Sequence, residues 1–248
     1  MADKPKTVVI GAGVGGLMSA ALIAQTGRSD VSVYERMSFA GGRFTQHDHD
    51  GYQIPTGAVH MIPHGKKGPF ANMILGKRRR GGLELGRHGV EFLPTTKFAC
   101  QIRDGKLSRA GSAFGILPWF SAKDAINLPG LLMKRAKDPW EDETEDGRTW
   151  LSRRFSDDFI DFLDAFSNFA ISLRFDQMPA STVVRMLQNS FWSDRPHVPK
   201  GGCKGVIDGL RKDLRENGTR VKLSHEITEI LPGDEEESTK NHRFCIGV

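Results

Sequence analysis

Three glycines near the start of the sequence have the spacing of a phosphate-binding turn. Gly11, Gly13 and Gly16 follow a β-branched run at residues 7–10 and lead into residues 14–24, where apolar side chains recur at helical spacing. This order predicts a strand, a tight turn and a helix whose free N–H groups lie at the positive end of the helix dipole. Gly13 leaves room for a pyrophosphate, and Gly11 and Gly16 permit the turn and close helix–strand packing. The residues therefore indicate that main-chain amides bind a dinucleotide.

An acidic residue follows at the position where it can reach a ribose. Glu35 comes directly after a second β-branched run at residues 31–34, about 20 residues beyond the last glycine, as the dinucleotide fingerprint requires. A carboxylate there can accept hydrogen bonds from the hydroxyls of the adenosine ribose and would repel a 2′-phosphate. The pattern therefore disfavours NADP, and together with the flanking strand and helix it disfavours an ordinary strand–helix turn.

A second glycine pair distinguishes FAD from NAD. Arg36 follows Glu35, and Gly41, Gly42 and Arg43 come shortly afterwards. This combination resembles the signature of flavoproteins of the glutathione-reductase type, in particular the flavin amine oxidase and phytoene desaturase superfamily, which includes carotenoid desaturases and retinol saturase-like proteins. Adjacent glycines let the chain pass close to a pyrophosphate, and a guanidinium offers it a fork of donors. The resemblance implies FAD as the cofactor.

Two further segments extend the resemblance. Residues 52–60 resemble the family segment that runs beside the flavin ring, although Ile54 and Pro55 stand near the position of an acidic residue that is frequent in the family. Residues 198–203 resemble the Pro-x-Gly-Gly element that returns the chain to the cofactor domain, and the family residue that matches Ile227 pairs its backbone with adenine. The motifs and the resemblance together imply cofactor contacts from Gly11, Gly13, Gly15, Gly16, Glu35, Arg36, Gly42, Arg43, Gly57, Ala58, His60 and Ile227.

The fold class that follows is α/β: a Rossmann-like FAD-binding domain of glutathione-reductase type with an inserted, mostly helical α+β substrate domain. Residues 1–69 are expected to form the first segment of the FAD-binding domain, 70–197 part of the substrate domain, and 198–248 the return segment. The composition of the middle supports the insertion, because Asp104-Gly105 predicts a tight hairpin turn. Helical patterns are predicted at residues 121–136, 149–155, 157–173 and 179–188.

An aromatic stripe lies within the third of these helices. Phe159, Phe162, Phe166, Phe169 and Leu173 recur at steps of three and four, so they share one helical face. Such a stripe most often packs into a core, which is the interpretation favoured here. The alternative is one wall of a tunnel for an apolar substrate.

Two stretches raise the question of membrane contact. Residues 114–120 and 128–133 are apolar but interrupted by Pro and Gly, and they could enter a membrane interface at a tunnel mouth or pack against other parts of the protein. Residues 77–80 are four consecutive cations, favoured as a solvated loop, with contact to anionic lipid headgroups as the alternative. Aromatic residues do not interleave with these cations, so nucleic-acid binding is disfavoured.

Length and cysteine content bound the remaining possibilities. The 248 residues carry a net charge of +5, and three widely spaced cysteines suggest neither a disulfide framework nor a metal site. A reduced cytoplasmic location, with peripheral membrane contact as an addition, is expected, because neither a signal peptide nor a long apolar run is present. His47 and His49 share a strand face without a third ligand, so no metal is predicted.

Members of the resembled family are about twice as long as this chain and end with a further Gly-Asp element. The resemblance therefore implies that this chain is a fragment, or half of a split enzyme with a complementary C-terminal chain.

The resemblance implies an FAD-dependent oxidoreductase that desaturates, saturates or isomerises an apolar polyene or isoprenoid. An amine oxidase-type flavoenzyme, a non-catalytic FAD-binding fragment and an NAD-binding module remain as alternatives. No triad order or pair of carboxylates stands out in the sequence, because flavin chemistry requires few protein groups. No catalytic residue is therefore assigned.

Overall fold

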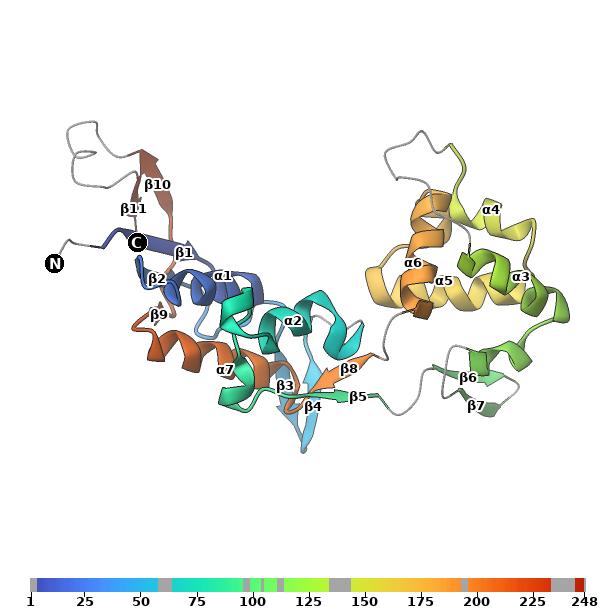
Figure 1. Ribbon diagram of the computed structural model, residues 1–248, viewed down its shortest axis with the longest axis horizontal. Helices are drawn as coiled ribbons and strands as arrows, with labels where there is room; N and C mark the ends of the chain where they lie inside the picture. Colours follow the sequence, from blue (N-terminus) through green and yellow to red (C-terminus); the bar gives the residue numbers. More distant parts are fainter. Residues whose placement is uncertain are drawn as a thin grey trace. The chain divides into compact units, whose positions relative to one another are not determined.

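The computed structural model describes residues 4–57, 64–95, 99–103, 105–110, 114–133, 144–192, 196–232 and 244–247. The chain divides into two compact units (Figure 1). Unit 1 contains Met1–Ile62, Lys66–Leu93 and His197–Val248, and unit 2 contains Pro63–Gly65 and Pro94–Pro196. Unit 2 thus interrupts the chain of unit 1. Residues 70–93 belong to unit 1, whereas the sequence analysis placed the boundary after residue 69.

A three-stranded parallel sheet forms the centre of unit 1. Its strands are β1 (Lys6–Ile10), β2 (Asp30–Tyr34) and β9 (Arg220–Lys222), in the order β1-β2-β9. Helix α1 (Val14–Ala24) connects β1 to β2, and α7 (Gly202–Glu216), which precedes β9, packs against α1 (Figure 1). This is the Rossmann-like β-α-β arrangement that the glycine pattern predicts.

The core of unit 1 lies between the sheet and these two helices. Val9, Val33 and Val221 stand side by side on neighbouring strands, and because side chains alternate along a strand they face the helices together. Small residues on α1 let α7 approach closely. The core includes the following buried side chains: Leu17, Ala20, Ala21, Ala24, Val31, Val33, Cys203, Val206, Leu210 and Leu214.

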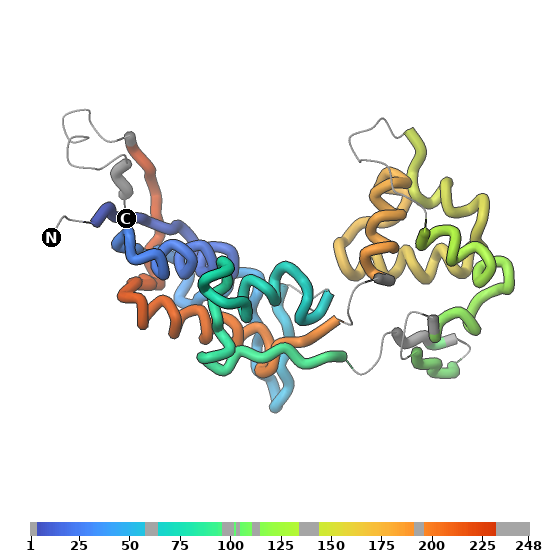
Figure 2. Tube along the Cα trace, viewed as in Figure 1, coloured from blue at the N-terminus to red at the C-terminus, as the bar shows by residue number. Residues whose placement is uncertain are grey.

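The remaining elements of unit 1 extend from this core (Figure 2). They are the antiparallel hairpin β3 (Gln46–His49) and β4 (Tyr52–Pro55), helix α2 (Pro69–Leu75), the paired strands β5 (Phe92–Pro94) and β8 (His197–Pro199), and the antiparallel pair β10 (Glu229–Pro232) and β11 (Phe244–Gly247). Three 3₁₀ turns, Gly65–Lys67, Arg78–Arg80 and Leu85–His88, flank and follow α2.

A buried carboxylate joins two of these turns to α7. Asp213 is fully buried, and its Oδ1 accepts a hydrogen bond from the Arg78 guanidinium at 2.6 Å and another from Arg87. His88 Nε2 lies 3.5 Å from the same oxygen. Arg78 is therefore part of an internal ion pair, so the interpretation of residues 77–80 as a wholly solvated run is wrong for this residue.

Unit 2 consists mainly of helices: α3 (Ala122–Met133), α4 (Gly147–Ser152), α5 (Asp157–Ile171) and α6 (Ala180–Trp192). The hairpin β6 (Ala99–Arg103) and β7 (Lys106–Ala110) confirms the predicted turn, with Arg103 opposite Lys106 and Gly105 at φ +72°. The side chains of Asp146 and Ser156 cap α4 and α5.

A buried aspartate joins α3 to the start of α5. Asp124 accepts hydrogen bonds from the backbone and hydroxyl groups of Ser121 and Ser156. Burial alone raises the pKa of a carboxyl group, but these hydrogen bonds outweigh it and lower the pKa of Asp124. Asp124 is therefore a structural residue of unit 2.

The aromatic stripe on α5 divides into a buried and an exposed half. Phe159 is fully buried and Phe162 is half-buried against Trp119 and Phe120. Phe166 and Phe169 are 37% and 55% exposed, because the buried face of α5 is formed by Ile160, Leu163 and Ser167. Leu173 is 41% exposed and lies beyond the end of α5 at Ile171, whereas the helix was predicted to extend to residue 173. The core interpretation of the whole stripe is therefore wrong for the second half.

The apolar stretches around α3 pack inside unit 2. Ile116, Leu128, Leu131 and Leu132 are buried, so few of these side chains remain to enter a membrane interface. Within the part of the chain that the structure describes, no helix is both long and apolar enough to cross a bilayer.

Candidate dinucleotide-binding site

The glycine turn follows β1 directly. Gly11 has φ +94° and donates its N–H to the carbonyl oxygen of Tyr34 at 2.7 Å, which ties the turn to the end of β2. A methyl group on Gly16 would collide with the carbonyl oxygen of Gly11. Both glycines therefore have the structural roles that the fingerprint predicts.

The N-terminus of α1 is open. Gly13 is the N-cap residue, no side chain caps the helix, and its first turn contains no acidic residue. A methyl group built on Gly13 or Gly15 would meet no atom within 4 Å. The first-turn amides, which have no acceptor within the helix, therefore lie beside open space at the positive end of the helix dipole. This is the cradle that a pyrophosphate requires.

Glu35 is held beside this turn. Its Oε2 accepts a hydrogen bond from the N–H of Ala12 at 2.7 Å, and its Oε1 accepts one from the N–H of Met37 at 2.9 Å. Each carboxylate oxygen retains a further lone pair for a sugar hydroxyl. The backbone N–H groups of Ala12 and Met37 thus fix the orientation of the carboxylate before any ligand binds.

The second glycine pair packs directly on the first turn. Gly41 donates its N–H to the carbonyl oxygen of Ala12 at 2.7 Å, and a methyl group on Gly42 would lie 3.3 Å from the Cα atom of Gly13. Gly42 has φ +59°, which favours glycine. The two motifs, separate in the sequence, therefore form one continuous backbone surface.

Two cations accompany this surface. Arg36 and Arg43 are exposed, and neither forms an ion pair with any residue that the structure describes. Guanidinium groups without an internal carboxylate remain available to the two negative charges of a pyrophosphate. The charge of the loop is thus complementary to the expected ligand.

The segment predicted to run beside the flavin ring reaches the same loop. A methyl group on Gly57 would collide with the carbonyl oxygen of Arg43, and Thr56 is joined to Thr45 by a backbone hydrogen bond of 3.2 Å and a side-chain hydrogen bond of 2.7 Å. Gly57 therefore lies directly against the backbone of Arg43, and its contact with a flavin ring stays a prediction. The predicted contacts Ala58 and His60 lie outside the described residues.

The segment before Ile227 is joined to the Glu35 loop. Ser224 donates its N–H to the carbonyl oxygen of Met37 at 3.0 Å, and His225 donates to that of Glu35 at 2.9 Å. Ile227 itself is half-buried and precedes β10. The hydrogen bonds bring the segment before Ile227 to the Glu35 loop, and the pairing of Ile227 with adenine stays a prediction.

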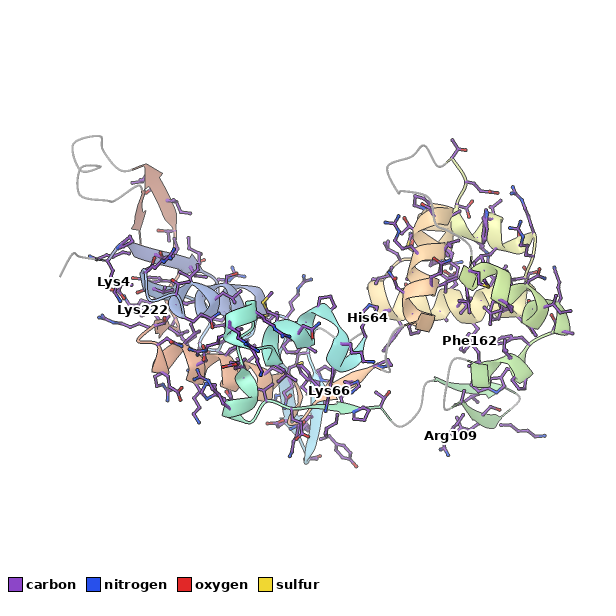
Figure 3. All side chains as sticks on the ribbon, viewed as in Figure 1. Lys4, His64, Lys66, Arg109, Phe162 and Lys222 are labelled. Carbon is purple, nitrogen blue, oxygen red and sulfur yellow. The ribbon has the colours of Figure 1, made fainter. Side chains whose placement is uncertain are left out.

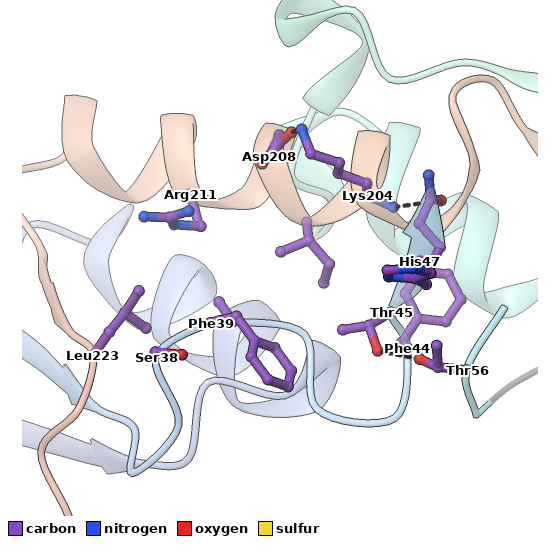
Figure 4. Close-up of a pocket in the computed structure, with 13 residues that line it drawn as sticks. Ser38, Phe39, Phe44, Thr45, His47, Thr56, Lys204, Asp208, Arg211 and Leu223 are labelled. Atoms are coloured by element: carbon purple, nitrogen blue, oxygen red, sulfur yellow. Dashed lines mark hydrogen bonds and ion pairs between the residues drawn. The ribbon is translucent and has the colours of Figure 1, made fainter. Parts of the chain in front are cut away.

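A pocket of about 460 Å³ lies between the loop after β2 and helix α7 (Figure 4). Phe39, Ile207 and Leu223 contribute apolar surface, and Lys204 on its rim forms an ion pair of 2.7 Å with Asp208. This pocket could not be predicted from the sequence, because its lining comes from separate segments that share no motif.

The histidine pair His47 and His49 and the cysteine Cys203 are not part of the glycine turn after β1. His47 and His49 stack with ring centroids 6.3 Å apart, and the described residues include no group of three His, Cys, Asp or Glu side chains that could hold a metal ion. Cys203 is buried as a free thiol, and burial raises its pKa to about 11. This cysteine is therefore protonated and unreactive at neutral pH.

Comparisons with known proteins agree with this geometry. The family described as the NAD(P)-binding Rossmann-like domain matches residues 9–74. A protein of Methanocaldococcus jannaschii is 28% identical over 90% of this chain and 52% of its own length. A 4,4′-diapophytoene desaturase of Staphylococcus aureus is 40% identical over 91% of this chain and 49% of its own length.

A solved structure extends the match to the whole fold. The crystal structure of an oxidoreductase from Methanosarcina mazei is 29% identical, with a TM-score of 0.73 over 92% of this chain and 53% of that protein. The chain spans about half the length of the relatives it matches. Over about nine tenths of its length the chain is thus similar to about half of a 4,4′-diapophytoene desaturase and of an archaeal oxidoreductase, and its residues 9–74 match the NAD(P)-binding Rossmann-like domain.

Proposed function

We propose that this chain provides the FAD-binding half of an oxidoreductase that desaturates, saturates or isomerises an apolar polyene or isoprenoid. The observation that carries the proposal is the open N-terminus of α1, where Gly13 and Gly15 leave space for a ligand. Beside this space, Glu35 and Arg43 carry the charges that a ribose and a pyrophosphate require, and Arg43 has no ion pair with the residues that the structure describes.

Each residue then has a defined task toward FAD. The first-turn amides of α1 hold the pyrophosphate, Arg43 adds charge-assisted hydrogen bonds, and Glu35 accepts hydrogen bonds from the ribose hydroxyls. The backbone at Ile227 pairs with adenine, and the segment at Gly57 passes beside the flavin ring. The flavin supplies hydride transfer, while the protein binds and orients the reactants.

The substrate class rests on the exposed half of the α5 stripe. Phe166 and Phe169 present apolar surface on one face of α5, and the exposed Leu173 follows just after the end of that helix. An exposed apolar face of this kind is typical of a binding surface, and a polyene has no polar groups that would need partners there. The similarity to a 4,4′-diapophytoene desaturase supports the same class.

The open edge and the exposed face of strand β1 favour the packing of a second polypeptide segment against the sheet of unit 1. Strand β1 is at the edge of the described sheet, and Val8 and Ile10 are 40% and 49% exposed on the face opposite α1. Parallel sheets are ordinarily covered on both faces, and an open edge can pair with another strand. The relatives contain about as much chain again beyond the matched region, and we assign the uncovered β1 to a strand of that complementary segment.

Anaerobic incubation with candidate substrates tests this function. FAD-loaded protein, co-purified with its complementary segment, should lose the oxidised flavin absorption band when an acyclic C30 or C40 polyene is added in detergent micelles, and should keep it with putrescine. Bleaching by the amine alone would favour the amine oxidase alternative. Bound FAD that neither compound bleaches would favour a non-catalytic fragment, and turnover without the complementary segment would contradict the role assigned to β1.

A further inference from the structure

Positive charge is concentrated in one stretch of unit 1. Residues 66–90 contain seven lysines and arginines and one acidic residue, Glu84. The net charge of this stretch exceeds the +5 of the whole chain. A field of one sign over so small a region attracts anionic partners and is screened by salt.

The structure separates these cations into two groups. Arg78 and Arg87 bind the buried Asp213 and are neutralised within the protein. The other five side chains are exposed, and the described residues provide none of them with an ion pair. We call these five the basic patch: Lys66, Lys67, Lys77, Arg79 and Arg80.

The basic patch is presented by a preformed backbone. Its residues lie at the two ends of α2, whose seven residues span about 10 Å, and Lys66 is labelled in Figure 3. The ion pair of Arg78 with Asp213 fixes the turn that carries Arg79 and Arg80. Gly82 packs so closely on Gly76 that a methyl group would collide with its backbone. The charges therefore need no folding transition before they meet a partner.

We propose that the basic patch docks this protein on the anionic surface of a lipid bilayer. The inference rests on the proposed function, because an apolar polyene resides in membranes and must be collected there. Each cation near an anionic leaflet strengthens binding about five-fold, so five of them suffice for reversible attachment without a membrane-spanning helix.

A nucleic acid fits the basic patch less well. Proteins that bind single strands combine cations with exposed aromatic rings on which bases stack. Phe70, the only Phe, Tyr or Trp in residues 66–90, is half-buried and packs against Phe44 and Phe92. The patch thus offers charge without stacking surfaces, as expected for contact with headgroups.

Vesicle sedimentation tests the docking surface. The protein should sediment with phosphatidylcholine vesicles that contain about one third phosphatidylglycerol at low salt, and should be released by high salt. The double variant Arg79→Gln, Arg80→Gln should bind about 30-fold more weakly, since two cations are lost. The control Arg153→Gln, Arg154→Gln removes two adjacent arginines from unit 2, where Arg153 pairs with Glu145 and Arg154 stacks on Trp150, and it should bind like the unmodified protein.

Any of three results would overturn the docking proposal. The first is the absence of sedimentation with anionic vesicles at low salt, and the second is equal binding by the patch variant. The third is tighter binding to a single-stranded oligonucleotide than to the vesicles. FAD uptake by the patch variant, measured in parallel, should be unchanged, so failure of the docking surface is distinguishable from failure of the cofactor site.

Discussion

Replacing Gly13 with alanine should lower the affinity for FAD at least about 100-fold while the protein folds as before. A methyl group at this position meets no protein atom within 4 Å, so the folded protein can accommodate it. The same methyl occupies the space assigned to the pyrophosphate and would remove about two charge-assisted hydrogen bonds of 1.5–3 kcal/mol each. Flavin fluorescence titration gives the affinity, and a thermal melt gives the stability.

A matched glycine serves as the control for this variant. Gly130 lies in α3 of unit 2, and a methyl group there also meets nothing within 4 Å, so Gly130→Ala should bind FAD normally. Gly16→Ala, in contrast, should lose stability before affinity can be measured, because its methyl collides with the carbonyl oxygen of Gly11. Unchanged FAD affinity in Gly13→Ala would show that the ligand lies elsewhere.

Replacing Asp213 with alanine should destabilise unit 1 by about 3 kcal/mol. The carboxylate is fully buried, and its removal leaves the guanidinium groups of Arg78 and Arg87 without their internal partner. Breaking a buried pair by removing one member costs about 3–5 kcal/mol, and the lower end applies because both arginines are partly exposed to water. Urea unfolding of the variant and the unmodified protein measures the difference.

The same helix provides the control for Asp213. Asp208 pairs with Lys204 at 2.7 Å on the surface of α7, with half of its side chain exposed. Asp208→Ala makes the same change in charge and helix composition but should alter stability by less than about 1 kcal/mol. Equal effects of the two substitutions would mean that the Asp213 cluster does not stabilise the junction of the two turns with α7.

The sequence predicted those features of the site whose geometry depends on the local backbone. The turn at Gly11, the helix after Gly13 and the carboxylate of Glu35 depend on residue types at fixed offsets within one β-α-β unit. The hairpin at Gly105 is predictable for the same reason, since positive φ values restrict the residue type. The close packing of Gly42 on Gly13 agrees with the prediction that both glycine motifs contact the same pyrophosphate.

The features that were mispredicted depend on tertiary contacts. Periodicity places Phe159 and Phe169 on one face of α5, but only the neighbouring helices decide which turns of that face are covered. Arg78 is indistinguishable from Arg79 in the sequence, and its partner Asp213 is 135 residues away. The pocket beside α7 likewise forms only when distant segments meet.

Hydrogen exchange at the start of α1 tests the central claim most directly. The amides of Val14, Gly15 and Gly16 have no acceptor within the helix and no capping side chain. Saturating FAD should slow exchange in this peptide at least about ten-fold, as expected for newly formed hydrogen bonds, and Gly13→Ala should abolish the protection. Exchange that FAD leaves unchanged here, while it protects another region, would contradict the assignment of this turn as the dinucleotide site.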